Sequence, residues 1–466
     1  MLGRPTYYQY CSFCFSMENI DFSKYKSKCY KHIDCPISFE KVKKYVSSST
    51  RIANHSFLPF LHYTISFEKY IGHKEGSERT RPIKIKEREI FYAGHLDSYI
   101  YRFYADVLNA KYNKWATENE VDTYSVAYRT NKKSQSSINF AASAISFIES
   151  TEDSLILIGD FKSFFDTLDH KLLKERLQRV LGVRSLSHDW YNVYKSLTKF
   201  GYLEKFELDH SESSLICKGK HSSYFSSVKD FRRYQRVHKC LHNDKSFGIP
   251  QGNSMSGVLA NVYSIDFDKD MGTLARRFDG IYKRYSDDFI VVLSIAKLKN
   301  TYGLSYLSQV TDRIVELADK NKIILQKEKT LARLYSNGEI LTPVQHEKSQ
   351  IDYLGFTFDG QNVKMREKSI YKFYRNARHL IRHSVAKRER EGLKKIPNRH
   401  KIYSLYTDFG CSERYPSNFI DYAKRAQKLF DNISPSTTNL MLEQLKNRKK
   451  IVERELGYRI HSRLNK

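Results

Sequence analysis

Two adjacent aspartates within an apolar stretch constrain the fold of this chain more than any other feature. Asp287 and Asp288 lie in Arg-Tyr-Ser-Asp-Asp-Phe-Ile-Val-Val at residues 284–292, and Asp160 ends the apolar run Leu-Ile-Leu-Ile-Gly-Asp at residues 155–160. Carboxylates are costly at the end of a buried strand unless something pairs with them. Two strands that present carboxylates side by side form an oxygen-rich pocket suited to Mg²⁺, which promotes in-line attack on phosphorus. The sequence therefore predicts a strand beside a hairpin, with Asp160, Asp287 and Asp288 as metal ligands.

The segment after Asp160 predicts a turn and then a helix that begins near Lys171. Its sequence is Phe-Lys-Ser-Phe-Phe-Asp-Thr-Leu-Asp-His, in which Asp169 is placed to cap the helix. Phe165 follows Asp160 by five positions, where a flat ring can close the floor of a sugar pocket and collide with a 2′-hydroxyl. Such a ring would select deoxynucleotides. The alternative is that Phe164 and Phe165 are both core residues.

A Gly/Pro turn followed by a helix is predicted at residues 247–261, Phe-Gly-Ile-Pro-Gln-Gly-Asn-Ser-Met-Ser-Gly-Val-Leu-Ala-Asn. Such a turn brings backbone close to a ligand, so Gln251 is placed to contact the sugar of a nucleotide. Further along, residues 323–330, Ile-Ile-Leu-Gln-Lys-Glu-Lys-Thr, predict a strand. Lys329 at its end is placed to donate a proton to a leaving pyrophosphate. The alternative is an ordinary solvated lysine.

Two more segments have strand character. Residues 351–358, Ile-Asp-Tyr-Leu-Gly-Phe-Thr-Phe, are followed by Asp359-Gly360 and a second short run at residues 362–365. Asp-Gly between two such runs is a strong hairpin signal. Upstream, residues 79–88 alternate charged and apolar side chains as a strand would. Arg81 in that basic strand is the best candidate to hold a triphosphate.

Taken in order, these segments resemble the motifs of reverse transcriptases. Asp160 with Phe165 is similar to the first catalytic motif and sugar gate of that family, and residues 247–261 contain a similar Pro-Gln-Gly motif. The signature Tyr-x-Asp-Asp is matched by Tyr285-Ser286-Asp287-Asp288. Two further segments resemble later motifs of the family: Lys329-Thr330, and Tyr353-Leu354-Gly355-Phe356, which is similar to the primer grip. The joint pattern spans about residues 79–366 and is highly specific.

The resemblance implies an α+β fold, that of a right-hand polymerase with fingers, palm and a C-terminal helical thumb. Residues 1–78 would form an N-terminal extension and the start of the fingers, residues 79–366 the fingers and palm, and residues 367–466 the basic thumb. The implied activity is that of an RNA-directed DNA polymerase, a nucleotidyltransferase that adds dNTPs by two-metal phosphoryl transfer. The implied metal is Mg²⁺, with Mn²⁺ as the alternative.

The resemblance also implies a role for each candidate site residue. Asp160 and Asp287 would bind both metals, and Asp288 would be a further metal ligand. Lys329 would act as a general acid. The residues expected to contact the nucleotide are Phe165, Gln251, Arg81 and Tyr285.

The charge of the chain favours a partner made of phosphates. The net charge is +27, and residues 361–466 contain 26 Lys and Arg against 10 Asp and Glu, which gives +16 of that excess. Apolar residues at helical spacing predict helices over 369–390, 401–408, 418–431 and 438–455. A basic helical thumb would bind RNA and the DNA product through the backbone, with a strong dependence on salt. The alternative is a charged bundle that is merely solvated.

The N-terminal cysteines are close to a zinc-ribbon spacing. Cys11 and Cys14 form one Cys-x-x-Cys pair, and Cys29 is followed by His32. We do not expect zinc there, because only one pair has this form. In addition, a start at Met17 would remove the first two ligands.

Other segments carry weaker signals. Residues 204–245 are polar and have no clear period, which favours an insertion or loop. No apolar run approaches the roughly 20 residues that span a bilayer, and nothing resembles a signal peptide. We therefore expect no membrane partner and a cytoplasmic localisation, with reduced thiols.

Among reverse transcriptases, the chain looks most like the bacterial defence-associated ones, the antiphage, abortive-infection and unknown-group enzymes. It has Ser256-Gly257 where many relatives from retrons and group II introns have Ser-Pro. This resemblance implies a noncoding RNA as template or scaffold, and a homo-oligomer or partner protein in some members. The alternatives are a retron or group II intron type of enzyme, an RNA-dependent RNA polymerase, and a palm that only binds nucleic acid. An RNA polymerase usually has Asp at the position of Phe165.

Overall fold

The chain has a mixed α and β fold that divides into two compact units. A computed structural model describes residues 20–70, 83–217, 222–326, 330–405 and 418–459. The first unit comprises residues 1–115 and 165–263, and the second comprises residues 116–164 and 264–466. The three-part division predicted from the sequence stays a prediction, and the two units are described separately below.

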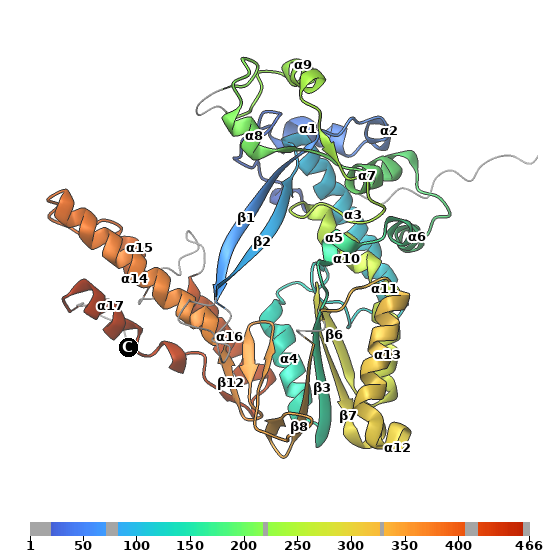
Figure 1. Cartoon of the computed structure of the whole chain (residues 1–466), viewed down its shortest axis with the longest axis vertical. Coiled ribbons are helices and arrows are strands. Elements are labelled where there is room, and N and C mark those ends of the chain that lie inside the picture. Colours follow the sequence, from blue (N-terminus) through green and yellow to red (C-terminus); the bar gives the residue numbers. More distant parts are fainter. Residues whose placement is uncertain (1–19, 71–82, 218–221, 327–329, 406–417, 460–466) are drawn as a thin grey trace, which may run out of the picture. The chain divides into compact units, whose positions relative to one another are not determined.

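The first unit contains a four-stranded sheet in the order β2-β1-β4-β5. The strands are β1 (Phe60–Tyr70), β2 (Ile83–Tyr92), β4 (Gly201–Glu204) and β5 (Leu241–His242). β1 and β2 form a long antiparallel ribbon, seen in Figure 1, and β1 pairs in parallel with β4. The strand predicted at residues 79–88 is confirmed from Ile83 onward, while residues 79–82 lie outside the described part of the chain.

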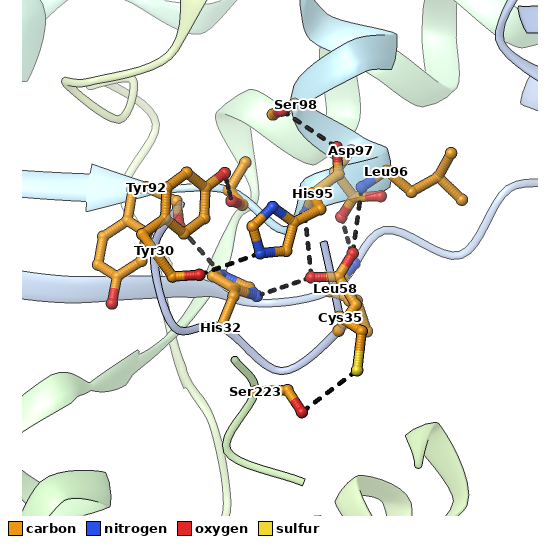
Figure 2. Close-up of polar contacts among 12 residues, drawn as sticks. Tyr30, His32, Cys35, Leu58, Tyr92, His95, Leu96, Asp97, Ser98 and Ser223 are labelled. Carbon is orange, nitrogen blue, oxygen red and sulfur yellow. Dashed lines mark hydrogen bonds and ion pairs between the residues drawn. The ribbon is translucent and has the colours of Figure 1, made fainter. Parts of the chain in front are cut away.

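The first unit also contains several helices, and aspartates bind the first backbone amides of two of them. They are α1 (Phe39–Val46), α2 (Ser49–Ala53), α3 (His95–Glu118), α5 (Phe164–Thr167), α6 (His170–Leu181), α7 (His188–Thr198) and α10 (Ser254–Tyr263). Asp169 caps α6 as predicted, since its Oδ1 accepts the Leu172 N–H at 2.9 Å. The Asp34 carboxylate accepts the backbone N–H groups of His95 and Leu96, at 2.9 and 3.1 Å. Figure 2 shows a further contact at the start of α3, where His95 Nε2 lies 3.1 Å from the Tyr30 carbonyl.

Residues 204–245 are not the loop that their polarity suggested. They contain α8 (Lys205–His210) and α9 (Val228–Val237). Their few apolar side chains gather into one core with Ile33 and Leu61, and the buried members include Leu208, Ile216, Tyr224, Phe225, Phe231 and Tyr234. The sequence did not show these two helices because the apolar residues have no regular spacing and find their partners in distant segments. That the segment is an insertion stays a prediction.

The second unit is built on a five-stranded sheet in the order β6-β7-β3-β8-β9. Its strands are β3 (Asp153–Asp160), β6 (Ile281–Tyr285), β7 (Asp288–Ser294), β8 (Leu331–Ser336) and β9 (Glu339–Leu341). Ile156 and Ile158 pack into a core with α4 (Ser137–Glu149). The helices on the other side in Figure 1 are α11 (Ile265–Arg277), α12 (Ile295–Tyr302) and α13 (Tyr306–Lys320). Helices on both faces explain why β3 and β7 are continuous apolar runs.

A second sheet in this unit has the order β10-β11-β12-β13. Its strands are β10 (Ile351–Tyr353), β11 (Phe356–Phe358), β12 (Asn362–Met365) and β13 (Thr438–Asn439). The hairpin predicted around Asp359-Gly360 is confirmed by the antiparallel pairing of β11 with β12. The C-terminal helices are α14 (Glu367–Arg390), α15 (Arg399–Tyr403), α16 (Phe419–Ile433) and α17 (Arg448–Leu456).

Two predicted elements of this unit differ from the structure. Residues 438–455 are not one helix, because Thr438 and Asn439 pair in parallel with β12 before α17 begins. Of the strand predicted over residues 323–330, residues 323–326 form only an isolated antiparallel bridge, which pairs Leu325 with Phe161, and residues 327–329 lie outside the described part of the chain. In this bridge the Lys162 N–H donates to the Ile324 carbonyl and the Gln326 N–H donates to the Asp160 carbonyl, both at 2.8 Å. In both cases a tertiary partner decides the backbone conformation.

None of the helices that the structure describes is both long enough and apolar enough to cross a membrane.

Candidate active site

The three predicted metal ligands lie at one end of two neighbouring strands. In the β3–β7 register, Asp160 is directly opposite Asp288. β6 and β7 are joined by the two-residue turn Ser286-Asp287, and the Phe161 N–H donates to the Asp287 carbonyl at 3.1 Å. Thus the apolar hairpin and the strand predicted from the sequence are adjacent. Their pairing brings the backbones of the three aspartates close together.

The donor chemistry of this cluster fits Mg²⁺. Asp160 is 8% exposed, Asp287 is half-buried and Asp288 is exposed. Among the residues that the structure describes, no group of three or more His, Cys, Asp or Glu side chains could hold a metal ion. Mg²⁺ commonly uses only one or two carboxylates, with substrate phosphates and water as its other ligands. Asp160 at the end of β3 and Asp287 in the turn before β7 would therefore suit a metal that arrives with a phosphorylated ligand.

A buried ion pair holds the turn that carries Asp287, and the sequence analysis missed it. Arg284 Nε and Nη2 donate to the two Asp268 oxygens at 2.8 and 2.7 Å, and Arg284 Nη1 donates to the Ser286 carbonyl at 2.8 Å. The side chains are 0% and 1% exposed. The Tyr282 hydroxyl also donates to Asp268, at 2.8 Å. An arginine within the apolar hairpin was the only sequence signal, because its partner lies on α11.

Aromatic side chains surround the same turn. Tyr285 is half-buried with its ring 6.2 Å from that of Phe140, and burial raises the pKa of its hydroxyl. The Tyr128 hydroxyl is 3.1 Å from the Ser286 Oγ. Tyr353, from the predicted primer grip, is fully buried, and burial together with the nearby Asp288 carboxylate raises the pKa of its hydroxyl. The predicted nucleotide contact Tyr285 therefore belongs to the same strand end as the aspartates.

Gly159 is required where β3 approaches β7. It is paired with Phe289, and a Cβ at Gly159 would lie 2.2 Å from the Phe289 ring. We expect Gly159→Ala to destabilise the protein by about 1–3 kcal/mol, as other overpacked cores are. Thermal unfolding measures the effect. Phe289→Leu in the Gly159→Ala background supplies the control, because a smaller side chain should restore part of the stability. A Gly159→Ala protein as stable as wild type would contradict this packing.

The predicted sugar-contacting residues, Phe165 and Gln251, lie in the first unit and are joined through backbone. The Ile249 N–H donates to the Phe165 carbonyl, and the Gly248 N–H donates to the Leu168 carbonyl, both at 2.9 Å. Phe165 is half-buried rather than a core residue. The Gln251 carbonyl accepts the Phe91 N–H of β2 at 2.8 Å. The segment that contains the Pro-Gln-Gly turn is therefore hydrogen-bonded both to residues 165–168 and to strand β2 of the sheet.

One contact in this region was not predicted. Gln251 Nε2 donates to Asp166 Oδ1 at 3.1 Å. Burial raises the pKa of the Asp166 carboxyl, the hydrogen bond from Gln251 opposes that shift, and the nearby Glu89 carboxylate adds to it. Asp166 therefore contacts Gln251, a side chain expected to bind the substrate, although the sequence analysis assigned no role to Asp166.

Several candidate residues lie outside the described part of the chain. These are Arg81, Lys329, Cys11 and Cys14. Of the remaining zinc candidates, Cys29 is exposed, whereas His32 is fully buried. The His32 ring contacts the Tyr92 carbonyl through Nε2 at 3.2 Å (Figure 2), and its Nδ1 lies 3.4 Å from Asp34. His32 therefore has a structural role in fastening the N-terminal segment.

Arginines gather along α14 and α17 of the second unit. They line a cavity of about 850 Å³, here called the basic groove, whose charged and aromatic residues include Tyr371, Arg375, Arg378, Arg382, Arg454 and Glu455. Glu455 is 10% exposed and pairs with Arg378 and Arg382 at 3.3 and 3.0 Å. One carboxylate thus orders two of the four arginines, which leaves a net positive groove suited to phosphate groups.

Comparison with known proteins gives no close relative. No protein-family model and no curated protein matches the chain. Among solved structures, it is similar to telomerase from Candida albicans in complex with a fragment of telomeric RNA, with a TM-score of 0.43 and 14% identity over 90% of this chain and 66% of that one. Apo telomerase from Candida tropicalis truncated from its C-terminal domain gives a TM-score of 0.41 and 15% identity, over 71% of this chain and 61% of that one. The chain thus spans under two thirds of the length of either telomerase.

Proposed function

We propose that this protein is an RNA-directed DNA polymerase that extends a primer with deoxynucleotides. The observation that carries the proposal is the register of β3 against β7, which pairs Asp160 with Asp288 beside the turn that holds Asp287. Carboxylates on neighbouring strands suit two-metal phosphoryl transfer. The order of the motifs along the chain supports the same reaction.

In this proposal, each candidate residue acts on the nucleotide or on its metal ions. Asp160 and Asp287 would hold Mg²⁺, with Asp288 as a further ligand. Bound Mg²⁺ would stabilise the charge on the phosphoryl oxygens during in-line displacement. Gln251 and Tyr285 would orient the nucleotide, and the Phe165 ring would exclude a 2′-hydroxyl. Arg81 would hold the triphosphate, and Lys329 would protonate the leaving pyrophosphate.

Parallel incorporation assays with labelled dNTPs and NTPs test the proposal. The protein, purified with any nucleic acid that accompanies it, should incorporate dNTPs and not NTPs in the presence of Mg²⁺. Incorporation of NTPs would support an RNA polymerase instead. Binding of nucleic acid without incorporation of either nucleotide class would overturn the enzymatic assignment in favour of a palm that serves as a binding module.

The proposed biological setting is bacterial antiphage defence with a noncoding RNA as template or scaffold. It is supported by the resemblance around Ser256-Gly257 and by the charge of residues 361–466. Sequencing of the RNA that copurifies with the protein tests it. One discrete RNA species is expected, and a random sample of cellular RNA would contradict a dedicated template.

We further propose that the basic groove binds the backbone of the nucleic acid, as a polymerase thumb would. Removal of one side chain that binds a phosphate should reduce the slope of log affinity against log salt by about one. Arg375→Ala combined with Arg454→Ala should therefore weaken RNA binding and lower that slope by about two. Arg313→Ala, on α13, is the matched control because it removes an exposed arginine from the same unit. If wild type, the double variant and Arg313→Ala gave equal slopes of log affinity against log salt, the basic groove would not bind the nucleic-acid backbone.

A further inference from the structure

A cluster of positive charge lies on α9, in a segment to which the proposed function gives no role. Lys229, Arg232, Arg233 and Arg236 are all exposed. Their spacing of three or four residues places them side by side on one face of the helix, here called the α9 face. The only acidic residue of α9 is Asp230, whose carboxylate lies 3.5 Å from Arg233 Nη1. Among the residues that the structure describes, none supplies a carboxylate partner to the other three cations.

The opposite face of α9 anchors the helix in its unit. Phe231 and Tyr234 are 3% and 4% exposed, and their rings lie 5.4 and 5.3 Å from that of Phe225. All three belong to the apolar core described above for residues 204–245. The Ser227 hydroxyl accepts the Asp230 N–H at 3.2 Å and so caps the first turn. The charges of the α9 face therefore stand on a helix that is held in place by its own unit.

This concentration of cations opposes helix formation. Like charges three or four residues apart on a helix repel one another. Each of the four cations has two such neighbours on the α9 face, since the positions are 229, 232, 233 and 236. A partner that supplies negative charge would relieve this repulsion.

The composition of the α9 face favours a phosphate backbone over other anionic partners. Three of its four cations are arginines, whose guanidinium groups bind phosphate through two parallel hydrogen bonds. Both aromatic side chains of α9 are buried, whereas protein interfaces are enriched in aromatic residues. The apolar face is also buried, so it cannot enter a lipid surface as that of a membrane-bound amphipathic helix does.

We propose that the α9 face is a second RNA-binding surface, which holds the sugar-phosphate backbone through contacts separate from those of the basic groove. The inference deepens the proposed function and rests on it for the choice of RNA over DNA. Contacts to phosphates carry no sequence information, so the surface should bind RNA with little regard to base sequence. It should change the affinity for RNA and not the rate of nucleotide addition, since none of its residues is a candidate metal ligand or nucleotide contact.

Lysine footprinting locates the contact directly. Acetylation of the full chain, read by mass spectrometry, is compared with and without a saturating labelled RNA hairpin of arbitrary sequence. Lys229 in α9 and Lys239 just after it are both exposed, and RNA should protect both. Lys171 and Lys195, exposed on α6 and α7 of the same unit, should keep their reactivity.

Removal of the charges measures their contribution. Lys229→Gln, Arg232→Gln and Arg236→Gln together should weaken equilibrium binding of the same hairpin by about tenfold, as expected for three exposed ionic contacts. The slope of log affinity against log salt should fall by about two to three. Thermal unfolding checks the fold, and its midpoint should equal or exceed that of wild type because repulsion within α9 is relieved.

Two controls separate the α9 face from charge in general. One removes three exposed cations elsewhere in the same unit, through Lys171→Gln, Arg184→Gln and Lys195→Gln, and should keep wild-type affinity and slope. The other, Arg232→Lys with Arg236→Lys, keeps both charges and should keep the wild-type slope while it loses part of the affinity.

Two results would overturn the inference. One is a triple α9 variant with wild-type affinity and slope, and the other is a complex in which Lys229 and Lys239 stay reactive. Binding of polyglutamate that depends on the α9 face, without such dependence for RNA, would assign the face to an acidic protein instead. Failure of the proposed polymerase function is a separate outcome. At saturating RNA the triple variant should incorporate dNTPs at the wild-type rate, so a wild type that incorporates none would remove the enzymatic assignment and leave the binding result standing.

Discussion

Replacement of Asp287 by asparagine is expected to lower deoxynucleotide incorporation by about a thousandfold or more. The change keeps the side-chain volume and removes one negative charge from the pair of carboxylates proposed to hold Mg²⁺. Metal ions contribute several kcal/mol to stabilisation of the transition state, and each 1.36 kcal/mol corresponds to about tenfold in rate. Single-turnover incorporation of a labelled dNTP measures the decrease.

The fold should survive this change, because Asp287 is half-buried in a two-residue turn whose backbone contact uses its carbonyl. Circular dichroism and thermal unfolding should therefore match those of wild type. Asp312→Asn is the matched control, since Asp312 is an exposed aspartate on α13 of the same unit. An Asp287→Asn protein with wild-type activity would remove Asp287 from the catalytic assignment.

Replacement of Arg284 by leucine is expected to produce the largest loss of stability among the changes considered. Arg284 and Asp268 form a fully buried pair, so removal of the guanidinium leaves an uncompensated carboxylate in the core. Such changes destabilise proteins by about 3–5 kcal/mol. For a unit of this size, the midpoint of thermal unfolding should fall by about 10 °C. Incorporation should fall as well, because Arg284 also bonds to the Ser286 carbonyl beside Asp287.

A second variant distinguishes the buried charge from a simple loss of packing. Asp268→Asn combined with Arg284→Leu removes both charges and keeps an acceptor for the Tyr282 hydroxyl. If the isolated carboxylate causes the destabilisation, the double variant should be more stable than Arg284→Leu alone. If the destabilisation of the double variant instead equalled the sum of those caused by Arg284→Leu and Asp268→Asn alone, the ion pair would not be the source of the effect.

Where the sequence analysis succeeded, the signal was local. Asp169 caps α6 because its carboxylate needs only the amide three residues away. The hairpin of β11 and β12 follows from Asp359-Gly360, since the turn and both strands lie within about ten residues. Continuous apolar runs likewise predicted β3 and β7, although they did not specify which strand would lie beside which.

Where it failed, the deciding partner was distant in sequence. Thr438 and Asn439 have side chains compatible with a helix, yet their backbone pairs with β12 about 75 residues upstream. Residues 323–326 have the composition of a strand, but they form only an isolated bridge, in which Leu325 pairs with Phe161. The apolar residues within 204–245 pack on Ile33 and Leu61, so no periodicity within the segment could have shown their core.

The sequence by itself determined the identity of the chemical groups: three aspartates, an aromatic ring five positions after Asp160, a glutamine in a Gly/Pro turn and a basic C-terminal region. Only the tertiary structure decided how these groups are held. The β3–β7 register brings Asp160 to Asp288, the buried Asp268 orients Arg284, and the Gln251 amide contacts Asp166. The physical reason is that composition and local spacing record which side chains are present. Register, buried ion pairs and amide orientation depend instead on contacts between segments that the chain brings together only on folding.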